Sequence, residues 1–243
     1  MPATSAIRQF DPNSVTEGAC VRAALILKHT HESARAILNA YCLVRSSRAG
    51  NKAVIGTSTN EEQDLLRAML VMSGAGLDSM TKQLVRDALP FIVHEDERAR
   101  GELESFIQKC LTQDFEALQE GRKVRFTAGA LASKVQRVWI VQQYVDDLTA
   151  GSLQSAAELR KIVAAFGLTQ ELITIDFQSL QEIFRIRNQI IHELDINLDA
   201  TRRNRNNRAK GTMVRDTNQL LSASQDLLEA VNQQLCLCLC LKA

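Results

Sequence analysis

The stretch IFRIRNQIIHEL occupies residues 183–194, and its apolar side chains recur at the three- and four-residue spacing of an α-helix that packs one face against a core. Asn188 and His192 are four positions apart, so they project from nearly the same face of this helix, with Arg185 beside them. The predicted helix therefore gathers an amide, an imidazole and a guanidinium group on one side. The opposite face is apolar and consists of Ile183, Ile186, Ile190, Ile191 and Leu194.

Arg187 falls, by the same helical arithmetic, inside the apolar sector. Burying an unpaired guanidinium costs several kcal/mol, so Arg187 should meet a carboxylate, the edge of a subunit interface or a bound phosphate. Asp78 is the first candidate carboxylate, because it lies in a stretch that is otherwise rich in small and apolar residues. Three further carboxylates stay open as partners: Glu61, Glu62 and Asp64.

The rest of the chain has the same helical character. Of its 243 residues, 45% are hydrophobic and 23% are charged, and the low content of 11 Gly and 3 Pro argues against a disordered or fibrous protein. We therefore expect an all-α fold with little or no strand. Apolar spacing and the residues that cap or end helices predict helices at about residues 17–44, 60–90, 95–118, 127–148, 152–167, 176–194 and 212–235.

A small, polar, slightly basic stretch at residues 45–59 has the composition of an exposed linker. It divides the chain into an N-terminal helical arm with its linker at residues 1–58 and a helical domain at residues 59–235. A Cys/Leu tail follows at residues 236–243, in which Cys and Leu alternate. This spacing is unlike that of metal-binding cysteines and fits packing, as an extended tail, a helix end or an interface.

The helix that opens the domain carries three local signals. Thr59 or Asn60 can cap its first amides while Glu62 or Gln63 reaches back, which is the pattern of a capping box. Pro90 cannot join a helix interior and should end it. Between these ends, Gly74 and Gly76 permit the close approach of another helix.

Composition and charge also limit the protein's location and partners. No stretch approaches the roughly 18 to 20 apolar residues of a membrane span, and residues 1–5 lack the pattern of a signal peptide, so we expect a cytoplasmic protein with no membrane partner. Cys20, Cys42 and Cys110 stand alone in helical patterns and are expected to be free thiols. Because the net charge is only +1, attraction to a polyanion must come from the placement of the charges.

Basic side chains cluster just downstream of the motif helix. Residues 201–210 contain five cations and no acid, a composition that suits contact with an RNA backbone. Such contacts would position a strand without reading its bases. The alternative is a solvated loop without a ligand. The candidate RNA-binding residues are Arg202, Arg203, Arg205, Arg208 and Lys210.

The segment at residues 184–193, FRIRNQIIHE, resembles the signature of the HEPN superfamily, in which an Arg is followed by a polar residue and then by a His four to six positions after the Arg. Residues 64–78 look like the first core helix of the RiboL-PSP-type branch of that superfamily. Together the resemblance covers about residues 60–234. Some toxin members carry a Tyr two residues after the His, where this chain has Leu194, so the Tyr-modifying antitoxin of that branch is not expected.

This resemblance implies an HEPN-like helical bundle that forms a homodimer with a composite active site for RNA cleavage, without a metal ion or other cofactor. His192 would act as general acid or base, Arg187 would hold the scissile phosphate, and Asn188 would orient the phosphate or the 2'-hydroxyl. Attack of the 2'-hydroxyl on the phosphate would leave 2',3'-cyclic phosphate and 5'-hydroxyl ends. Arg185 and Asp78 are supporting candidates.

The resemblance further implies a role as a toxin or in antiviral defence, with a protein partner that inhibits or activates cleavage. One alternative is a non-catalytic HEPN-like module that binds RNA or dimerises. Another is a helical scaffold in which residues 187–192 form an ordinary polar helix end, with a snorkelling Arg and a His hydrogen-bonded to a neighbouring carbonyl.

Overall fold

A computed structural model of the chain describes residues 6–49, 58–112, 126–130, 132–133, 135–169, 171–196 and 205–240. The described part contains helices and no strand, apart from one isolated bridge between Ile196 and Arg205, which confirms the all-α prediction. Two short 3-10 helices, Pro12–Ser14 and Gly18–Cys20, precede the first long helix. The α-helices are α1 (Val21–Ala49), α2 (Asn60–Asp87), α3 (Leu89–Glu95), α4 (Glu97–Thr112), α6 (Gln136–Thr149), α7 (Ala156–Ala165), α8 (Phe177–Glu193) and α9 (Lys210–Cys240).

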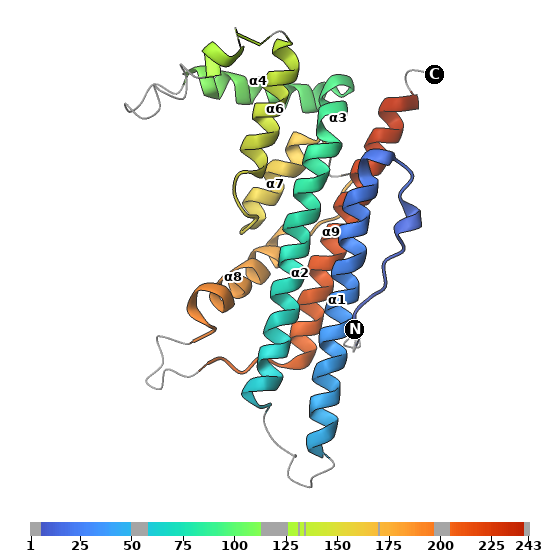
Figure 1. Cartoon of the computed structure of the whole chain (residues 1–243), viewed down its shortest axis with the longest axis vertical. Coiled ribbons are helices and arrows are strands. Elements are labelled where there is room, and N and C mark those ends of the chain that lie inside the picture. Colours follow the sequence, from blue (N-terminus) through green and yellow to red (C-terminus); the bar gives the residue numbers. More distant parts are fainter. Residues whose placement is uncertain are drawn as a thin grey trace.

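Three long helices form the body of the molecule. The chain runs along α1, turns back along α2 and finally returns through α9, which points in the same direction as α2 (Figure 1). The shorter helices α4, α6 and α7 gather at one end beside α3, and α8 lies against the side of α2 (Figure 1). Because α2 packs against α1, α8 and α9, it is the central element on which the motif helix rests.

The apolar stripe predicted for α2 supplies the centre of the core. Most of its leucine, methionine and valine side chains are almost completely buried, together with residues of α1, α8 and α9 in one continuous cluster, whereas Met72 is 45% exposed. Such burial stabilises a helical bundle at about 25 cal/mol per Å² of apolar surface. The buried α2 side chains are Leu66, Met69, Leu70, Leu77, Met80, Leu84 and Val85.

Several predicted helix ends are confirmed. The Thr59 side chain accepts a hydrogen bond from the Glu62 amide while the Glu62 carboxylate accepts one from the Thr59 amide, completing the capping box of α2. Asp176 caps α8, whose start the sequence places at Asp176 or Ser179. Gly167, predicted to end the helix of residues 152–167, follows α7 and has a φ of 68°, a conformation that favours glycine.

Other helix ends differ from the prediction. The helix predicted from residue 152 begins only at Ala156 with Ser155 as its cap, because Glu158 stands three residues after Ser155 and bonds back to its amide. Pro90 lies in the first turn of α3, where its missing amide is tolerated, and α2 has already ended at Asp87. Of the helix predicted at residues 95–118, α4 covers Glu97–Thr112, and residues 113–118 lie outside the described residues.

The two glycines of α2 permit close helix packing, as predicted. A Cβ at Gly76 would collide with the side chain of Thr30, so α1 crosses α2 at this point. A Cβ at Gly74 would lie 3.5 Å from Nε of Arg187, so the motif arginine of α8 lies against this position. Gly74 and Gly76 therefore face different neighbours.

The N-terminal segment packs on the same core. Ile7, Phe10 and the buried side chains of α1 belong to the continuous apolar cluster that contains α2 and α9. Helix α1 also continues to Ala49, so Arg45 and Arg48, which the sequence assigns to the linker, lie in its last turns. Both arginines pair with the fully buried carboxylate of Glu62, which ties the end of α1 to the start of α2.

The first five residues of the Cys/Leu tail, 236–240, continue α9 and include the buried Cys238. All six cysteines are free thiols, which confirms the prediction for Cys20, Cys42 and Cys110. No helix in the described part of the chain is both long and apolar enough to cross a membrane.

Candidate functional site

Helix α8 presents the predicted motif on its exposed side. His192 lies in its last turn and is exposed, and within the described residues it has no hydrogen bond or ion pair. Ile191 and Leu194 on either side of it are 38% and 62% exposed. The imidazole is therefore open to solvent and flanked by apolar surface.

Arg187 points toward α2, as its place in the apolar sector predicts. Its Nη1 donates a hydrogen bond to Oδ1 of Asn188 at 3.0 Å, and its Nε is buried with no hydrogen-bond partner in the described part of the chain. An unpaired buried donor costs about 1 to 3 kcal/mol, and more when it is charged. Arg187 thus carries unused hydrogen-bonding capacity beside Asn188.

The prediction that Asp78 pairs with Arg187 is wrong. Asp78 is a helical neighbour of Lys82, whose ammonium lies 2.9 Å from Oδ2, and Oδ1 accepts a hydrogen bond from the Leu153 amide at 2.7 Å. Two alternative partners also have other contacts: Glu62 binds the arginines of α1, and Asp64 pairs with Arg67 and Arg205. Among the described residues, no carboxylate forms an ion pair with Arg187.

Asn188 connects the motif to the loop before α7. Its Nδ2 donates a hydrogen bond to the backbone carbonyl of Gln154 at 3.1 Å. Arg185, the supporting candidate, is exposed and forms a two-point ion pair with Glu182 on its own helix, with distances of 2.9 and 2.7 Å. The structure therefore brings Arg187 and Asn188 together, keeps His192 one turn away, and places Arg185 outside this group.

A buried carboxylate lies immediately after the motif helix. Leu194 and Asp195 both have left-handed backbone conformations, with φ of 52° and 60°, and this turn directs the Asp195 side chain inward. Its oxygens accept hydrogen bonds from Nε of Arg67 at 2.9 Å, Nη2 of Arg208 at 2.5 Å and Nδ2 of Asn206 at 3.0 Å. Burial alone would raise the pKa of Asp195, but these hydrogen bonds outweigh it and the pKa is lowered.

The described basic residues of the predicted RNA-binding loop have partners within the chain. Arg205 pairs with Asp64 at 2.6 Å and donates to the Leu194 carbonyl, and Arg208 binds Asp195. Lys210 lies 3.5 Å from Sγ of Cys42, and its ammonium is 5.6 Å from the ring centre of Tyr41. Arg202 and Arg203 lie outside the described residues.

Arg67 and Asp195 were not among the predicted site residues, although the sequence contains a signal for one of them. Arg67 occupies a buried position on the apolar stripe of α2, next to Leu66, and a charge in such a stripe requires a partner. The pattern that demands a partner for Arg187 therefore demands one for Arg67 as well. Asp195 gives no comparable signal, because its burial depends on the left-handed turn after α8.

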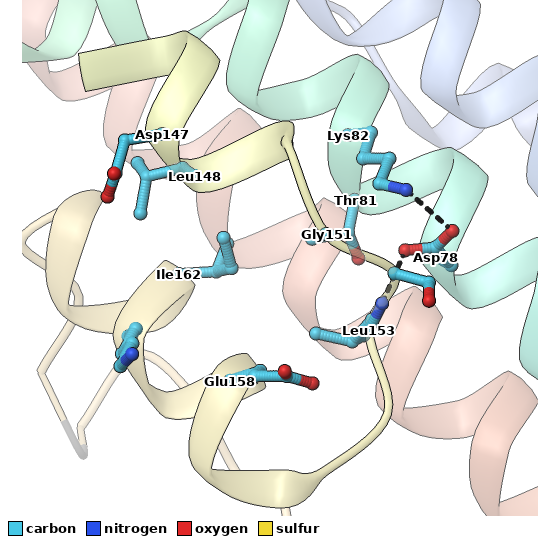
Figure 2. A pocket seen from close by; sticks show the side chains of 11 residues that line it. Asp78, Thr81, Lys82, Asp147, Leu148, Gly151, Leu153, Glu158 and Ile162 are labelled. Atoms are coloured by element: carbon cyan, nitrogen blue, oxygen red, sulfur yellow. Dashed lines mark hydrogen bonds and ion pairs between the residues drawn. The ribbon is translucent and has the colours of Figure 1, made fainter. Parts of the chain in front are cut away.

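A cavity of about 200 Å³, lined in part by the loop before α7, lies between α2, α6 and α7 (Figure 2). Asp78 and Thr81 project from α2 toward this loop, and Glu158 lies across from them on α7 (Figure 2). Leu153 lines the cavity and its neighbour Gln154 binds Asn188, so the loop connects the cavity to the motif.

The arrangement places one proton-transfer group and one cation on the same helix. An imidazole can accept or donate a proton, and the terminal nitrogens of a guanidinium can bind a phosphate. Both groups lie on α8, which is held by the Asp195 hydrogen bonds at its end and by Asn188 on its side. Comparison of the chain with protein-family models, with curated proteins and with solved structures found no match.

Proposed function

We propose that this protein is a metal-independent endoribonuclease whose site is built around His192, Asn188 and Arg187 on α8. The observation that carries the proposal is the combination on one helix of an exposed imidazole and a half-buried Arg187 with which no carboxylate of the described residues forms an ion pair. The likeness of residues 184–193 to the HEPN signature supports the same assignment.

The reaction needs one group to accept a proton and another to donate one. A base takes the proton of the ribose 2'-hydroxyl as its oxygen attacks phosphorus, and an acid protonates the 5'-oxygen as the bond between phosphorus and this oxygen breaks. The products carry a 2',3'-cyclic phosphate and a 5'-hydroxyl. Arg187 would stabilise the charge on the phosphoryl oxygens, while Asn188 would orient the phosphate or the 2'-hydroxyl.

Two copies of the chain would together supply both proton-transfer groups. Each α8 offers a single histidine, and apolar surface at Ile191 and Leu194 flanks it. Pairing of two such surfaces would bury these side chains and bring two copies of His192 near one another. The proposal therefore includes a homodimer with a site shared between its subunits.

The cellular setting is part of the same proposal. An unrestrained ribonuclease arrests growth, which suits a toxin or an antiviral defence protein kept in check by a partner. Expression of the wild-type chain in a bacterial host should slow growth, and the His192→Ala chain should not. Equal growth of both cultures at equal protein levels would argue against this setting.

A non-catalytic RNA-binding or dimerisation module is the second candidate. It is favoured by the hydrogen bond between Arg187 and Asn188 and by that between Asn188 and the Gln154 carbonyl, because these contacts give both side chains a structural role. In that case the motif would hold α8 against its neighbours without touching a scissile phosphate.

Incubation of the purified protein with single-stranded RNA in EDTA distinguishes the two candidates. We expect cleavage by the wild type and a loss of at least about a hundredfold for His192→Ala and Arg187→Ala. His29→Ala is the matched control, because His29 is also an exposed helical histidine but lies on α1, paired with Glu32. Equal cleavage by all four proteins rejects the assignment, and RNA binding without cleavage supports the second candidate.

A further inference from the structure

The N-terminal segment lies along α1 before the chain turns into that helix (Figure 1). Its first described part, residues 6–10, has no regular secondary structure, and we call it the latch. Ile7 and Phe10 of the latch are buried and belong to the continuous apolar core. The latch is therefore a piece of irregular backbone whose apolar side chains are inserted into the core.

One residue from α9 and one from α1 bind the backbone of the latch. Asn218 of α9 accepts a hydrogen bond from the Arg8 amide at 3.1 Å and donates one to the Ala6 carbonyl at 3.0 Å. His31 of α1 donates a hydrogen bond from Nδ1 to the Arg8 carbonyl at 2.9 Å. Its ring also stacks on that of Phe10, with the two ring centres 5.8 Å apart. The contacts of His31 therefore depend on the docked position of the latch.

The rest of the N-terminal segment has a separate anchor. The short 3-10 helix Pro12–Ser14 follows the latch, and Oδ1 of Asn232 then accepts hydrogen bonds from the Thr16 and Glu17 amides at 3.2 and 3.0 Å. Given the rise of an α-helix, Asn232 lies about 20 Å further along α9 than Asn218. The latch can therefore detach while the Asn232 anchor stays in place.

The docked latch accepts only one protonation state of His31. A carbonyl oxygen can only accept, so Nδ1 carries the hydrogen and Nε2 of the neutral ring carries none. His31 is 4% exposed, and its Nε2 is buried with no hydrogen-bond partner in the described part of the chain. A second proton would make Nε2 a buried, charged donor without an acceptor, which is unfavourable in a folded protein. The docked state therefore requires the neutral imidazole.

The charged groups around His31 do not offset this requirement. Burial lowers the pKa of His31 below its ordinary value of 6.5 and Arg35 of α1 lowers it further, whereas the hydrogen bond to the Arg8 carbonyl acts in the opposite direction. Arg8 of the latch is itself a cation, and on α9 Asn218 is uncharged while Asp226 interacts with Arg8. Among the described residues, no carboxylate forms an ion pair with His31, so an imidazolium at this position would not be neutralised.

We propose that residues 6–10 form an acid-sensitive latch, which stays docked while His31 is neutral and detaches when His31 is protonated. Release would expose Ile7 and Phe10 and the apolar surface that they cover. Docking is fully favoured above pH 6.5, the ordinary pKa of the released imidazole, and weakens as the pH falls from there toward the lower pKa of the docked state. The inference goes beyond the proposed ribonuclease activity and does not depend on it.

Amide hydrogen exchange of the full-length protein, resolved by residue with NMR and corrected for the intrinsic exchange rate, measures release of the latch. The Arg8 amide reports on the latch, the Glu17 amide on the Asn232 anchor, and the Leu77 amide on the core. Between pH 7.5 and 5.5 we expect the protection of the Arg8 amide to fall about five- to tenfold, while that of Glu17 and Leu77 changes less than about twofold.

Three variants test whether His31 causes this change. His31→Gln keeps a donor for the Arg8 carbonyl but does not titrate, so its Arg8 protection should be the same at both pH values. His29→Gln is the matched control, because His29 is an exposed histidine of the same helix. Asp226→Asn removes the titratable group that interacts with Arg8. Both control variants should keep the pH dependence of the wild type.

Phe10→Ala tests the same coupling from the side of the latch. Loss of the stacked ring weakens docking, so the pKa of His31, measured by NMR titration of its ring, should rise toward 6.5. An unchanged pKa of His31 in this variant would overturn the proposal even if His31→Gln failed to fold.

A fall in Arg8 protection that disappears in His31→Gln and persists in both controls supports the latch. Protection that is independent of pH in the wild type, or an equal fall in His31→Gln, overturns it. A parallel fall at Leu77 also overturns it, because acid would then unfold the whole protein rather than release residues 6–10.

Discussion

The guanidinium of Arg67 lies with its Nε 2.9 Å from Oδ2 of Asp195, although the two residues are 128 positions apart in the chain. Both side chains are nearly or completely buried. Arg67 also donates to the Asn206 carbonyl at 2.6 Å, so this pair joins the start of α2 to the segments on both sides of residues 197–204. It therefore fixes the end of α8, where His192 is located.

Removal of the Asp195 carboxylate should destabilise the protein strongly. Asp195→Ala leaves the buried Arg67 guanidinium without its buried carboxylate partner, and breaking a buried ion pair in this way costs about 3 to 5 kcal/mol. Asp64→Ala is the control, because Asp64 also pairs with Arg67 but is 52% exposed, and exposed pairs contribute at most about 1 kcal/mol. Urea unfolding followed by circular dichroism measures both; equal effects would show that the Asp195 pair is not the stronger one.

Stability should also depend on pH through Asp195. Burial opposes ionisation, but the hydrogen bonds from Arg208, Asn206 and Arg67 lower the pKa of the folded carboxyl below its ordinary value of 3.8. The resulting stabilisation is fully present above pH 3.8 and is lost as the pH falls through the lower folded pKa. The difference in unfolding free energy between the wild type and Asp195→Asn should thus be constant from pH 7 to about 5 and shrink below about 4.

Asp226 provides the opposite case for comparison. Burial and the nearby Glu229 raise its pKa, so its charged form is disfavoured by folding. Asp226→Asn should therefore leave the unfolding free energy at pH 7 unchanged or higher. A loss of unfolding free energy at pH 7 comparable to that of Asp195→Asn would contradict the opposite directions of the two pKa shifts.

Substitutions at the two glycines of α2 should have opposite effects. A Cβ at Gly76 would overlap the Thr30 side chain of α1, so Gly76→Ala should cost about 1 to 3 kcal/mol. A Cβ at Gly74 would make ordinary contact with Arg187, and alanine is the better helix former by up to about 1 kcal/mol. The melting temperature of Gly74→Ala should equal or exceed that of the wild type, and the melting temperature of Gly76→Ala should be lower. The reverse order would contradict the close contact between Gly76 and Thr30.

Leu194 allows dimerisation to be tested separately from folding. It is 62% exposed and has a φ of 52°, a conformation that costs a leucine more than an asparagine. Leu194→Asn should keep or raise the unfolding free energy while it removes apolar surface beside His192. We expect weaker self-association in sedimentation equilibrium and a parallel loss of RNA cleavage. A fully active monomer would rule out the shared site.

Local sequence signals predicted much of the helical framework. The capping pattern at Thr59 and Glu62, the cap at Asp176 and the glycine at position 167 each act within a few residues of where they stand, so the sequence alone predicts them. The start of α7 follows the same capping-box spacing, because Ser155 has a glutamate three residues later and Ser152 does not.

These local signals do not predict contacts between segments that are distant in the sequence. Asp78 was expected to bind Arg187, but Lys82, four residues further along α2, pairs with it and the Leu153 amide takes its other oxygen. A helical neighbour four residues away is a strong competitor for any distant partner. The Arg67–Asp195 pair depends on a left-handed turn that follows from no residue pattern in the sequence.

The chemical ends of the RNA products give the most direct test of the central claim that His192 catalyses attack by the 2'-hydroxyl. Wild-type protein and the His192→Ala variant are incubated with one defined RNA in EDTA, and the fragments are analysed by mass spectrometry. The account predicts 2',3'-cyclic phosphate and 5'-hydroxyl ends from the wild type and a loss of these fragments in the variant. Fragments with 3'-hydroxyl and 5'-phosphate ends, or the same fragments in equal amounts from both proteins, would contradict it.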